Sequence, residues 1–267
     1  DRETAKIDAL VAEQRRLMDL LREKRQAVIS HAVTKGLNPE APMKDSGVEW
    51  LGAVPAHWDL NPLKRYIAFI TSGSRGWADH YADKGDVFLR IANLTRETIR
   101  LDLDDVQRVQ VPEGAEGERT RVESGDILFS ITAYLGSVAV IPDSFEGGYV
   151  SQHVALVRVN KALLEPTFGA YAALSICGQT WFQRQSYGGT KIQLSLDDVR
   201  DLPIPVPPIE EQRSIVGFIE AELSRLEEMS AEAMRAVTIL NERRAALITA
   251  AVTGQIYVRG LALSEAA

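Results

Sequence analysis

The chain has 267 residues, of which 30 are Lys or Arg and 37 are Asp or Glu, and its formal net charge is −7. This length suits one large domain or two small ones. A single cysteine, Cys177, excludes an internal disulfide, and no apolar run is long enough for a membrane helix. We expect a cytoplasmic protein, and its negative charge argues against a nucleic-acid binder.

The two ends of the chain repeat each other. Residues 21–34 (LREKRQAVISHAVT) align with residues 240–253 (LNERRAALITAAVT), with eight identities in fourteen positions. The offset maps Ile209 to a point before Asp1, so we expect the first copy to be shortened and the chain to continue upstream. Each copy predicts a long helix, with Gly36 and Gly254 as helix-ending residues. The second helix is expected to begin after Pro207-Pro208, with Glu210 and Glu211 in its first turn.

Apolar residues in both copies follow a seven-residue a/d pattern. This pattern predicts that the two helices pack on each other as an antiparallel coiled coil; a seam left free for an outside helix is the alternative. The residues expected to make the packing are Ile7, Leu10, Leu17, Leu21, Val28, Leu226, Met229, Leu240 and Leu247.

The region between the helices has a different pattern. Residues 37–57 are rich in Gly and Pro and predict a turn-rich linker. From Trp58 onward, short apolar runs at residues 88–92, 127–131, 137–141 and 154–159 predict strands, and residues 168–185 predict a helix. The fold class expected is therefore mixed α/β: one domain built on a twisted sheet, plus two long helices.

No catalytic motif occurs. The sequence has no phosphate-binding loop, no dinucleotide-binding glycine pattern and no nucleophile elbow. The four His and one Cys lack metal-ligand spacing. An unrecognised active site in the central domain stays open as an alternative, but we expect no catalysis and no metal.

Three short stretches combine basic, aromatic and amide side chains with glycine: residues 71–77, 151–153 and 183–193. Glycine lets the backbone approach a phosphate, Arg and Lys neutralise it, and Gln can read a base edge. These features favour DNA recognition. The alternatives are a simple turn at Gly188-Gly189, a buried aromatic at Trp77 and a structural histidine at His153.

The arrangement resembles the specificity subunit of type I restriction–modification enzymes. Segments 45–58, 74–77, 88–94, 125–128, 150–153, 188–191 and 202–215 look like that family's landmarks in order. The chain corresponds to the second half of such a subunit. The residues that we expect at DNA are Ser74, Arg75, Trp77, Arg90, Asn93, Tyr134, Ser151, Gln152, His153, Arg184, Tyr187, Gly188, Gly189, Thr190, Lys191 and Gln193.

The resemblance implies an organisation and a set of partners. It implies a conserved helix at 1–36, a linker at 37–57, a target recognition domain at 58–207, a spacer helix at 208–254 and a tail at 255–267. It implies that the chain reads one half of a split double-stranded DNA target and docks methyltransferase subunits through its helices. A restriction and translocase subunit, and the N-terminal half of the specificity subunit or a second copy of this chain, complete the partners. S-adenosylmethionine, ATP and Mg are expected on partner subunits and not on this chain.

Charge limits this interpretation. Residues 58–205 hold 15 Lys and Arg against 19 Asp and Glu, so DNA binding has to depend on local loops and on partner subunits. We therefore expect weak DNA affinity for the isolated chain. The other class that stays open is a helical interaction scaffold with no role at DNA.

Overall fold

The computed structural model describes residues 2–73, 75–111, 115–186 and 193–255. The chain divides into two compact units. One, here called the helix-pair unit, consists of Asp1–Arg25 and Glu220–Ala267. The other, here called the sheet unit, is Gln26–Ile219.

Two long helices dominate the ends of the chain: α1 (Arg2–Lys35) and α6 (Ile209–Val252). Helix α6 begins directly after Pro207-Pro208 and has Glu210 and Glu211 in its first turn, as predicted. Gly36 and Gly254 follow the two helices with φ angles of 74° and 73°. In this left-handed conformation glycine avoids the Cβ clash of other residues, so the predicted helix ends are confirmed.

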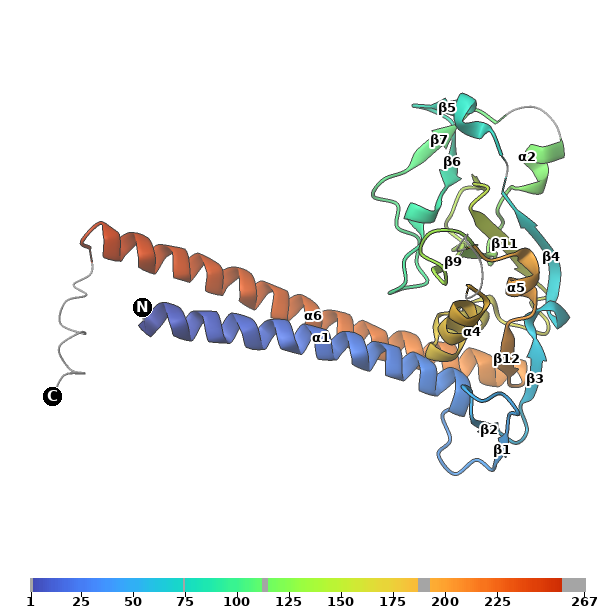
Figure 1. The fold of residues 1–267 in the computed structure, drawn as a ribbon, viewed down its shortest axis with the longest axis horizontal. Helices are drawn as coiled ribbons and strands as arrows, with labels where there is room; N and C mark the ends of the chain where they lie inside the picture. Colours follow the sequence, from blue (N-terminus) through green and yellow to red (C-terminus); the bar gives the residue numbers. More distant parts are fainter. Residues whose placement is uncertain (1, 74, 112–114, 187–192, 256–267) are drawn as a thin grey trace. The chain divides into compact units, whose positions relative to one another are not determined.

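In the helix-pair unit, α1 and α6 contact each other in opposite chain order (Figure 1). Asp8 pairs with Arg244 at 2.7 Å, and Arg25 pairs with Glu227 at 3.1 Å. A small apolar cluster joins the helices, and it consists of Ile7, Val11 and Val237 with Leu240 and Leu247 packed against it.

The residues of α1 that are buried against α6 differ in part from the predicted a/d residues. Leu10 and Leu17 are 45% and 37% exposed, whereas Val11 is buried. In α6, Met229 is 46% exposed, whereas Ala233 and Val237 are buried. Leu10, Leu17 and Met229 therefore do not form the seam. The apolar stripe of each helix is wider than one contact line, so the sequence pattern did not decide which edge faces the other helix.

The other predicted packing residues have mixed burial. Ile7 and Leu21 are buried. Val28, which lies in the sheet unit, and Leu226, Leu240 and Leu247 are half-buried.

The sheet unit contains two four-stranded and two two-stranded sheets within the described residues. The central sheet has the order β4-β11-β8-β9, and a second sheet has the order β10-β6-β7-β5. The bounds are β4 (Ile67–Ser72), β11 (Val154–Val159), β8 (Ile127–Ser130), β9 (Val138–Val140), β10 (Gly148–Val150), β6 (Asp86–Leu89), β7 (Gln107–Val109) and β5 (Tyr81–Ala82). The small sheets pair β1 (Met43–Asp45) with β2 (Ala53–Pro55) and β3 (Asp59–Pro62) with β12 (Pro203–Val206). The β5–β6–β7 region and the β1–β2 hairpin lie at opposite ends of this unit (Figure 1).

Short helices complete the sheet unit. Helix α3 (Pro166–Leu174) packs on β8 and β9, and α4 (Ile176–Ser186) follows it directly. The others are α2 (Ala115–Arg119), α5 (Leu196–Arg200) and the 3-10 turns η1 (Leu63–Arg65), η2 (Trp77–His80) and η3 (Ile91–Asn93).

The inner strands of the central sheet, β8 and β11, are buried on both faces. All four residues of β8 are buried, and Phe129 packs edge-on against Phe182 of α4 with ring centroids 6.1 Å apart. An ion pair joins β11 to the residue directly before β8. Arg158 donates two hydrogen bonds of 2.8 Å to Asp126, whose side chain is 1% exposed. These bonds raise the pKa of the Arg158 guanidinium above its ordinary value, so the guanidinium stays charged.

Several predictions of local structure were wrong in detail. The predicted helix at 168–185 is two helices, because the chain turns at Ser175, whose Oγ donates to the Ala172 carbonyl and accepts from Gly178 N–H. The predicted strand at 88–92 ends at Leu89, and η3 begins at Ile91. The single twisted sheet is replaced by several smaller sheets. The predicted linker at 37–57 holds the β1–β2 hairpin.

Candidate nucleic-acid interface

The loops that follow β4 and β8 and the loop that precedes β11 lie at the same end of the central sheet. Strand β4 ends at Ser72, which pairs with Ala155 of the antiparallel β11, and β8 ends at Ser130, which pairs with Val154. The segments after β4, after β8 and before β11 therefore emerge together. We call this end of the sheet the loop end, defined by residues 73, 75–77, 131–137 and 151–153, together with 193–194, where the Leu194 N–H bonds to Ile131.

Backbone hydrogen bonds hold these loops against one another. The Ile131 N–H donates to the His153 carbonyl at 3.1 Å, and the Leu194 N–H donates to the Ile131 carbonyl at 2.9 Å. At Gly73 a Cβ atom would collide with the backbone of Val150 and Ser151, so only glycine permits this close approach. Segments far apart in the sequence thus form one surface.

Five of the predicted DNA-contacting residues are exposed on this surface. The Gln152 Nε2 and His153 Nε2 atoms lie 3.0 Å apart, so the turn before β11 presents an amide and an imidazole side by side. The exposed residues are Arg75, Tyr134, Gln152, His153 and Gln193.

Tyr134 has an unusual backbone. Its φ is 57°, which makes it the one non-glycine residue with positive φ in the described part of the chain. Such a conformation costs an aromatic residue about 1–3 kcal/mol. Its loop is fixed by three hydrogen bonds: Ser130 Oγ to the Ala133 carbonyl (2.6 Å), Ser137 N–H to the Tyr134 carbonyl (3.1 Å) and Gln179 Nε2 to the Gly136 carbonyl (2.8 Å). The ring is therefore held out at 67% exposure by a supported loop.

A pocket of about 440 Å³ opens beside Tyr134. Arg96, Gln179 and Gln183 were missed in the sequence and line it together with the loop after β8. Their signal was the four-residue spacing of Gln179 and Gln183, which places both amides on one face of α4. Arg96 came from a separate segment, so only the tertiary structure joined it to them.

Three predicted DNA-contacting residues are buried instead. Trp77 is 4% exposed and stacks on Phe88 with ring centroids 5.6 Å apart, as in the alternative of a buried aromatic. Asn93 is 2% exposed; its amide donates to the Asp102 and Asp105 carbonyls, and its oxygen accepts from Arg90 N–H. Ser151 is 6% exposed. In this structure their side chains are therefore not accessible to a ligand.

Two predicted arginines are already engaged by protein groups. The Arg90 guanidinium pairs with Asp105 at 3.2 Å. The Arg184 guanidinium lies 4.3 Å from the Trp50 ring centroid and 3.1 Å from a Glu49 oxygen. These contacts attach α4 to the β1–β2 hairpin and give Arg184 a structural role.

The remaining predicted residues, Ser74, Tyr187, Gly188, Gly189, Thr190 and Lys191, lie outside the described residues. Within the described residues no cluster of His, Cys, Asp and Glu has the arrangement of a metal site. Burial raises the pKa of the Cys177 thiol, so it is a poor nucleophile at neutral pH. No described helix has the length and apolar character of a membrane span.

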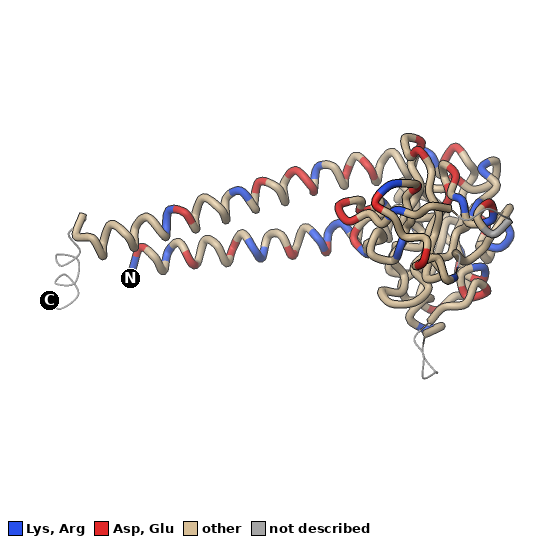
Figure 2. The backbone as a smooth tube through the Cα atoms, turned by 90° about the horizontal axis from the view of Figure 1, so that it is seen from above, with Lys and Arg blue, Asp and Glu red and all other residues tan. Residues whose placement is uncertain are grey.

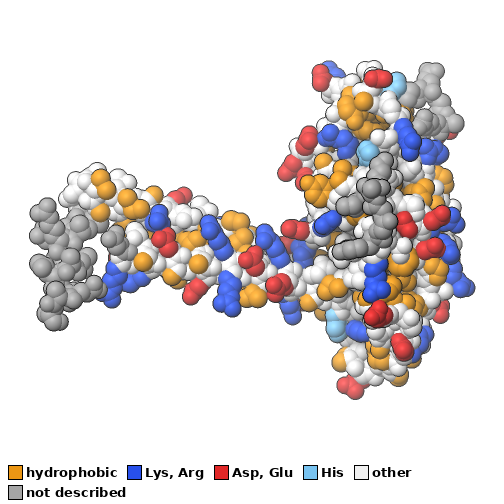
Figure 3. Space-filling model, viewed as in Figure 1, with side chains coloured by type: hydrophobic (Ala, Val, Ile, Leu, Met, Phe, Trp, Pro, Cys, Tyr) orange, Lys and Arg blue, Asp and Glu red, His pale blue; other side chains and the backbone are white. Residues whose placement is uncertain are grey.

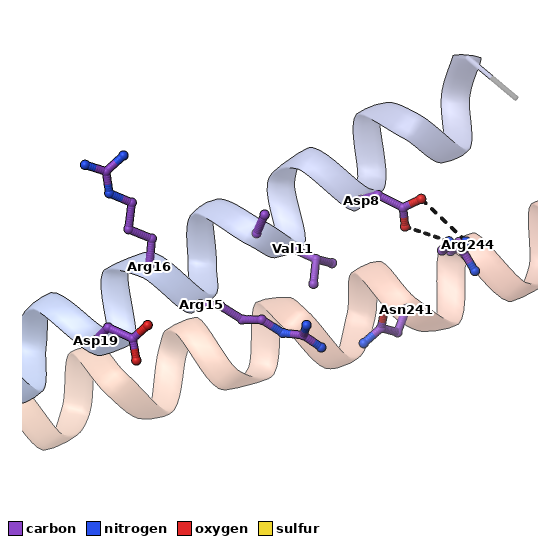
Figure 4. Close-up of a pocket in the computed structure, with 8 residues that line it drawn as sticks. Asp8, Val11, Arg15, Arg16, Asp19, Asn241 and Arg244 are labelled. Atoms are coloured by element: carbon purple, nitrogen blue, oxygen red, sulfur yellow. Dashed lines mark hydrogen bonds and ion pairs between the residues drawn. The ribbon is translucent and has the colours of Figure 1, made fainter.

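The helix-pair unit has its own groove, which carries both signs of charge. It is lined by Arg15, Arg16 and Asn241 among others (Figure 4). The Arg15 side chain extends over α6, while Arg16 extends away from it. Acidic and basic residues alternate along both helices (Figure 2), so the described part of this unit has no continuous basic track for a phosphate backbone.

The chain matches known proteins over most of its length. The family model of the type I restriction modification DNA specificity domain matches residues 78–232. The chain therefore belongs to this family.

Individual relatives agree. The chain is 22% identical over 259 residues to the type I restriction enzyme EcoBI specificity subunit of Escherichia coli, covering 94% of this chain and 54% of that protein. It is 23% identical over 212 residues to the putative type I restriction enzyme MjaX specificity subunit of Methanocaldococcus jannaschii, covering 78% of this chain and 48% of that protein. The chain thus spans about half the length of the curated relatives it matches.

Solved structures share the fold. A chain from work on complex assembly and conformational transition of the type I R-M system superposes with a TM-score of 0.65 at 20% identity, covering 94% of this chain and 58% of that one. The HsdS subunit from Thermoanaerobacter tengcongensis gives a TM-score of 0.57 at 19% identity, with 96% and 58% covered. The mixed α/β fold class is confirmed by this likeness.

Proposed function

We propose that this chain is the part of a type I specificity subunit that reads one half of a bipartite double-stranded DNA target. The observation that carries the proposal is the loop end, where a basic, an aromatic and two amide side chains from separate segments meet on one surface. Arginine positions a duplex through its phosphates, while amides and aromatic rings contact base edges. The chain itself performs no catalysis in this proposal.

The helices supply the second half of the proposal. Apolar side chains remain exposed along the helix-pair unit among the charged ones (Figure 3). The exposed set consists of Leu10, Leu17, Leu20, Met229, Met234, Ile239, Ile248 and Val252. We propose that α1 and α6 form an antiparallel coiled coil whose outer stripe docks methyltransferase subunits. The restriction subunit and the other half of the specificity subunit, or a second copy of this chain, join the same assembly. S-adenosylmethionine, ATP and Mg belong to the partner subunits.

The DNA-binding proposal is tested by selecting duplexes from a randomised pool with the full chain, alone and with methyltransferase subunits. We expect enrichment of one short motif, weakly with the chain alone and strongly with the assembly, because this chain is acidic overall. Absence of any enriched motif in both arms would overturn the proposal and favour the scaffold alternative. Incubation of the isolated chain with methyl donor and DNA is expected to give no methyl transfer.

The spacing role of the helices has a separate test. Deletion of four residues, 233–236, shortens α6 by about 6 Å at roughly 1.5 Å per residue. In the complete enzyme we expect a shorter gap between the two half-sites in the methylated sequence, with the half-sites themselves unchanged. An unaltered gap would exclude a ruler function for this helix. Because four residues do not preserve a heptad, a seven-residue deletion is the matched control for register.

A further inference from the structure

We propose that the pocket beside Tyr134 is the base-reading subsite of this chain, with Tyr134 and Gln183 as specificity-determining residues and Arg96 as the contact to the adjacent phosphate. The proposal rests on the proposed function, because it names the part of the loop end that engages the target. Its ligand is one base pair of duplex DNA together with its flanking phosphate.

Neighbouring side chains and backbone groups hold Tyr134 in its unusual conformation. A positive φ at an exposed tyrosine persists only where surrounding contacts impose it, and such residues concentrate at functional sites. Ser130, Ser137 and Gln179 make the three hydrogen bonds that impose it here. Gly136, with φ 82°, lies so close to Gln179 that a Cβ atom would collide with that amide. The loop is thus built to hold an exposed aromatic ring in one place.

The side chains that line the pocket suit a nucleic-acid ligand. Its lining consists of Arg96, Thr132, Ala133, Tyr134, Leu135, Gln179, Gln183 and Ser186, which includes one cation and no acid. Gln179 is occupied by the loop carbonyl and by the Ala173 carbonyl. Gln183, one helical turn further on, is exposed and supplies the donor and acceptor pair that a base edge requires. Arg96 is exposed, and no described residue forms an ion pair with it.

The pocket lies beside the other exposed segments of the loop end. The same loop bonds through Ile131 to the backbone of His153 and Leu194. The pocket loop is therefore bonded to the segments that carry the exposed side chains of Gln152, His153 and Gln193, and these segments offer a duplex further contacts. An isolated small-molecule site would not need these links.

The experiment uses the full chain, assembled with methyltransferase subunits, and duplexes selected from a randomised pool. Tyr134→Asn removes the ring while keeping a residue that tolerates positive φ, and Gln183→Ala removes the free amide. For each we expect loss of preference at one base position of the motif by roughly 5- to 150-fold, with the other positions retained. The matched control is Gln185→Ala, which alters an exposed amide of the same helix outside the pocket and should leave the motif unchanged.

The phosphate contact is tested by salt dependence. Arg96→Gln should lower the slope of log affinity against log salt by about one unit without changing the motif. Arg65→Gln, at the opposite end of β4, should leave the slope unchanged. Circular dichroism of each variant verifies folding, and Tyr134→Phe provides a milder second variant that keeps the ring.

The outcomes separate the two proposals. If the unmodified chain enriches no motif, the proposed function fails, and this subsite fails with it. If it enriches a motif that Tyr134→Asn and Gln183→Ala leave intact at every position, DNA recognition stands and the subsite is overturned. Loss of all preference in both variants, with folding intact, would also overturn a one-position subsite.

Discussion

The sheet unit and the helix-pair unit are stabilised in different ways. The sheet unit has a core of fully buried aromatic and aliphatic side chains, among them Trp58, Phe129 and Phe168. The helix-pair unit has a narrow seam around Ile7, Val11 and Val237, and it leaves many large apolar residues exposed. A unit that buries its apolar surface is self-sufficient, whereas one that exposes it is suited to a partner.

The largest expected effect tests the core of the sheet unit. Phe129→Ala removes a ring that is 1% exposed, and we expect the free energy of unfolding to fall by about 3–5 kcal/mol. Urea denaturation measures it. The control is Phe69→Ala, which alters a 37% exposed ring beside Arg158 and should cost about 1 kcal/mol or less. Equal losses in the two variants would contradict the assigned core.

A smaller effect is expected for the buried amide of the sheet unit. Asn93→Ala leaves its three backbone partners without that amide, at a cost of up to about 3 kcal/mol. The exposed Gln152→Ala should change stability by no more than about 0.5 kcal/mol. Thermal unfolding of both variants compares a structural amide with a surface amide. A destabilising Gln152→Ala would show that the loop end contributes to the fold.

The helix seam should respond less than the sheet core. Ile7→Ala removes a buried seam residue, and we expect about 2 kcal/mol of lost stability, the lower end for such a change because the seam is thin. Leu10→Ala, at a 45% exposed position, should cost well under half of this in the isolated chain. Amide hydrogen exchange over residues 2–25 measures both. Greater opening in Leu10→Ala than in Ile7→Ala would indicate that Leu10 lies in the seam, as the sequence pattern predicted.

The smallest effect is expected for a surface ion pair of the helices. Asp8 and Arg244 are 54% and 42% exposed, and solvent screens their attraction. Asp8→Asn should therefore cost less than about 1 kcal/mol, and added salt should reduce the difference further. A salt-independent loss of several kcal/mol would show that this pair, rather than the apolar seam, holds the helices together.

Local signals in the sequence determined the long helices. Prolines before α6, acidic residues in its first turn and glycines after both helices act within a few residues, so their effect needs no tertiary context. Strand β11 was also predicted with its observed bounds, because a run of apolar residues interrupted only by Arg158 suits a buried strand. The ordered landmarks of the specificity family were equally visible without a structure.

Tertiary packing decided the rest. Leu10 and Val11 both lie on the wide apolar stripe of α1, and only the fit against α6 selected Val11 for the seam. Likewise Trp77, Asn93 and Tyr134 were equivalent candidates in the sequence, since residue type does not reveal burial. The fold also brought Arg96, Tyr134 and Gln183 from three segments to one pocket and enclosed Trp77 and Asn93, because neighbours in space are set by the packing of the elements and not by distance along the chain.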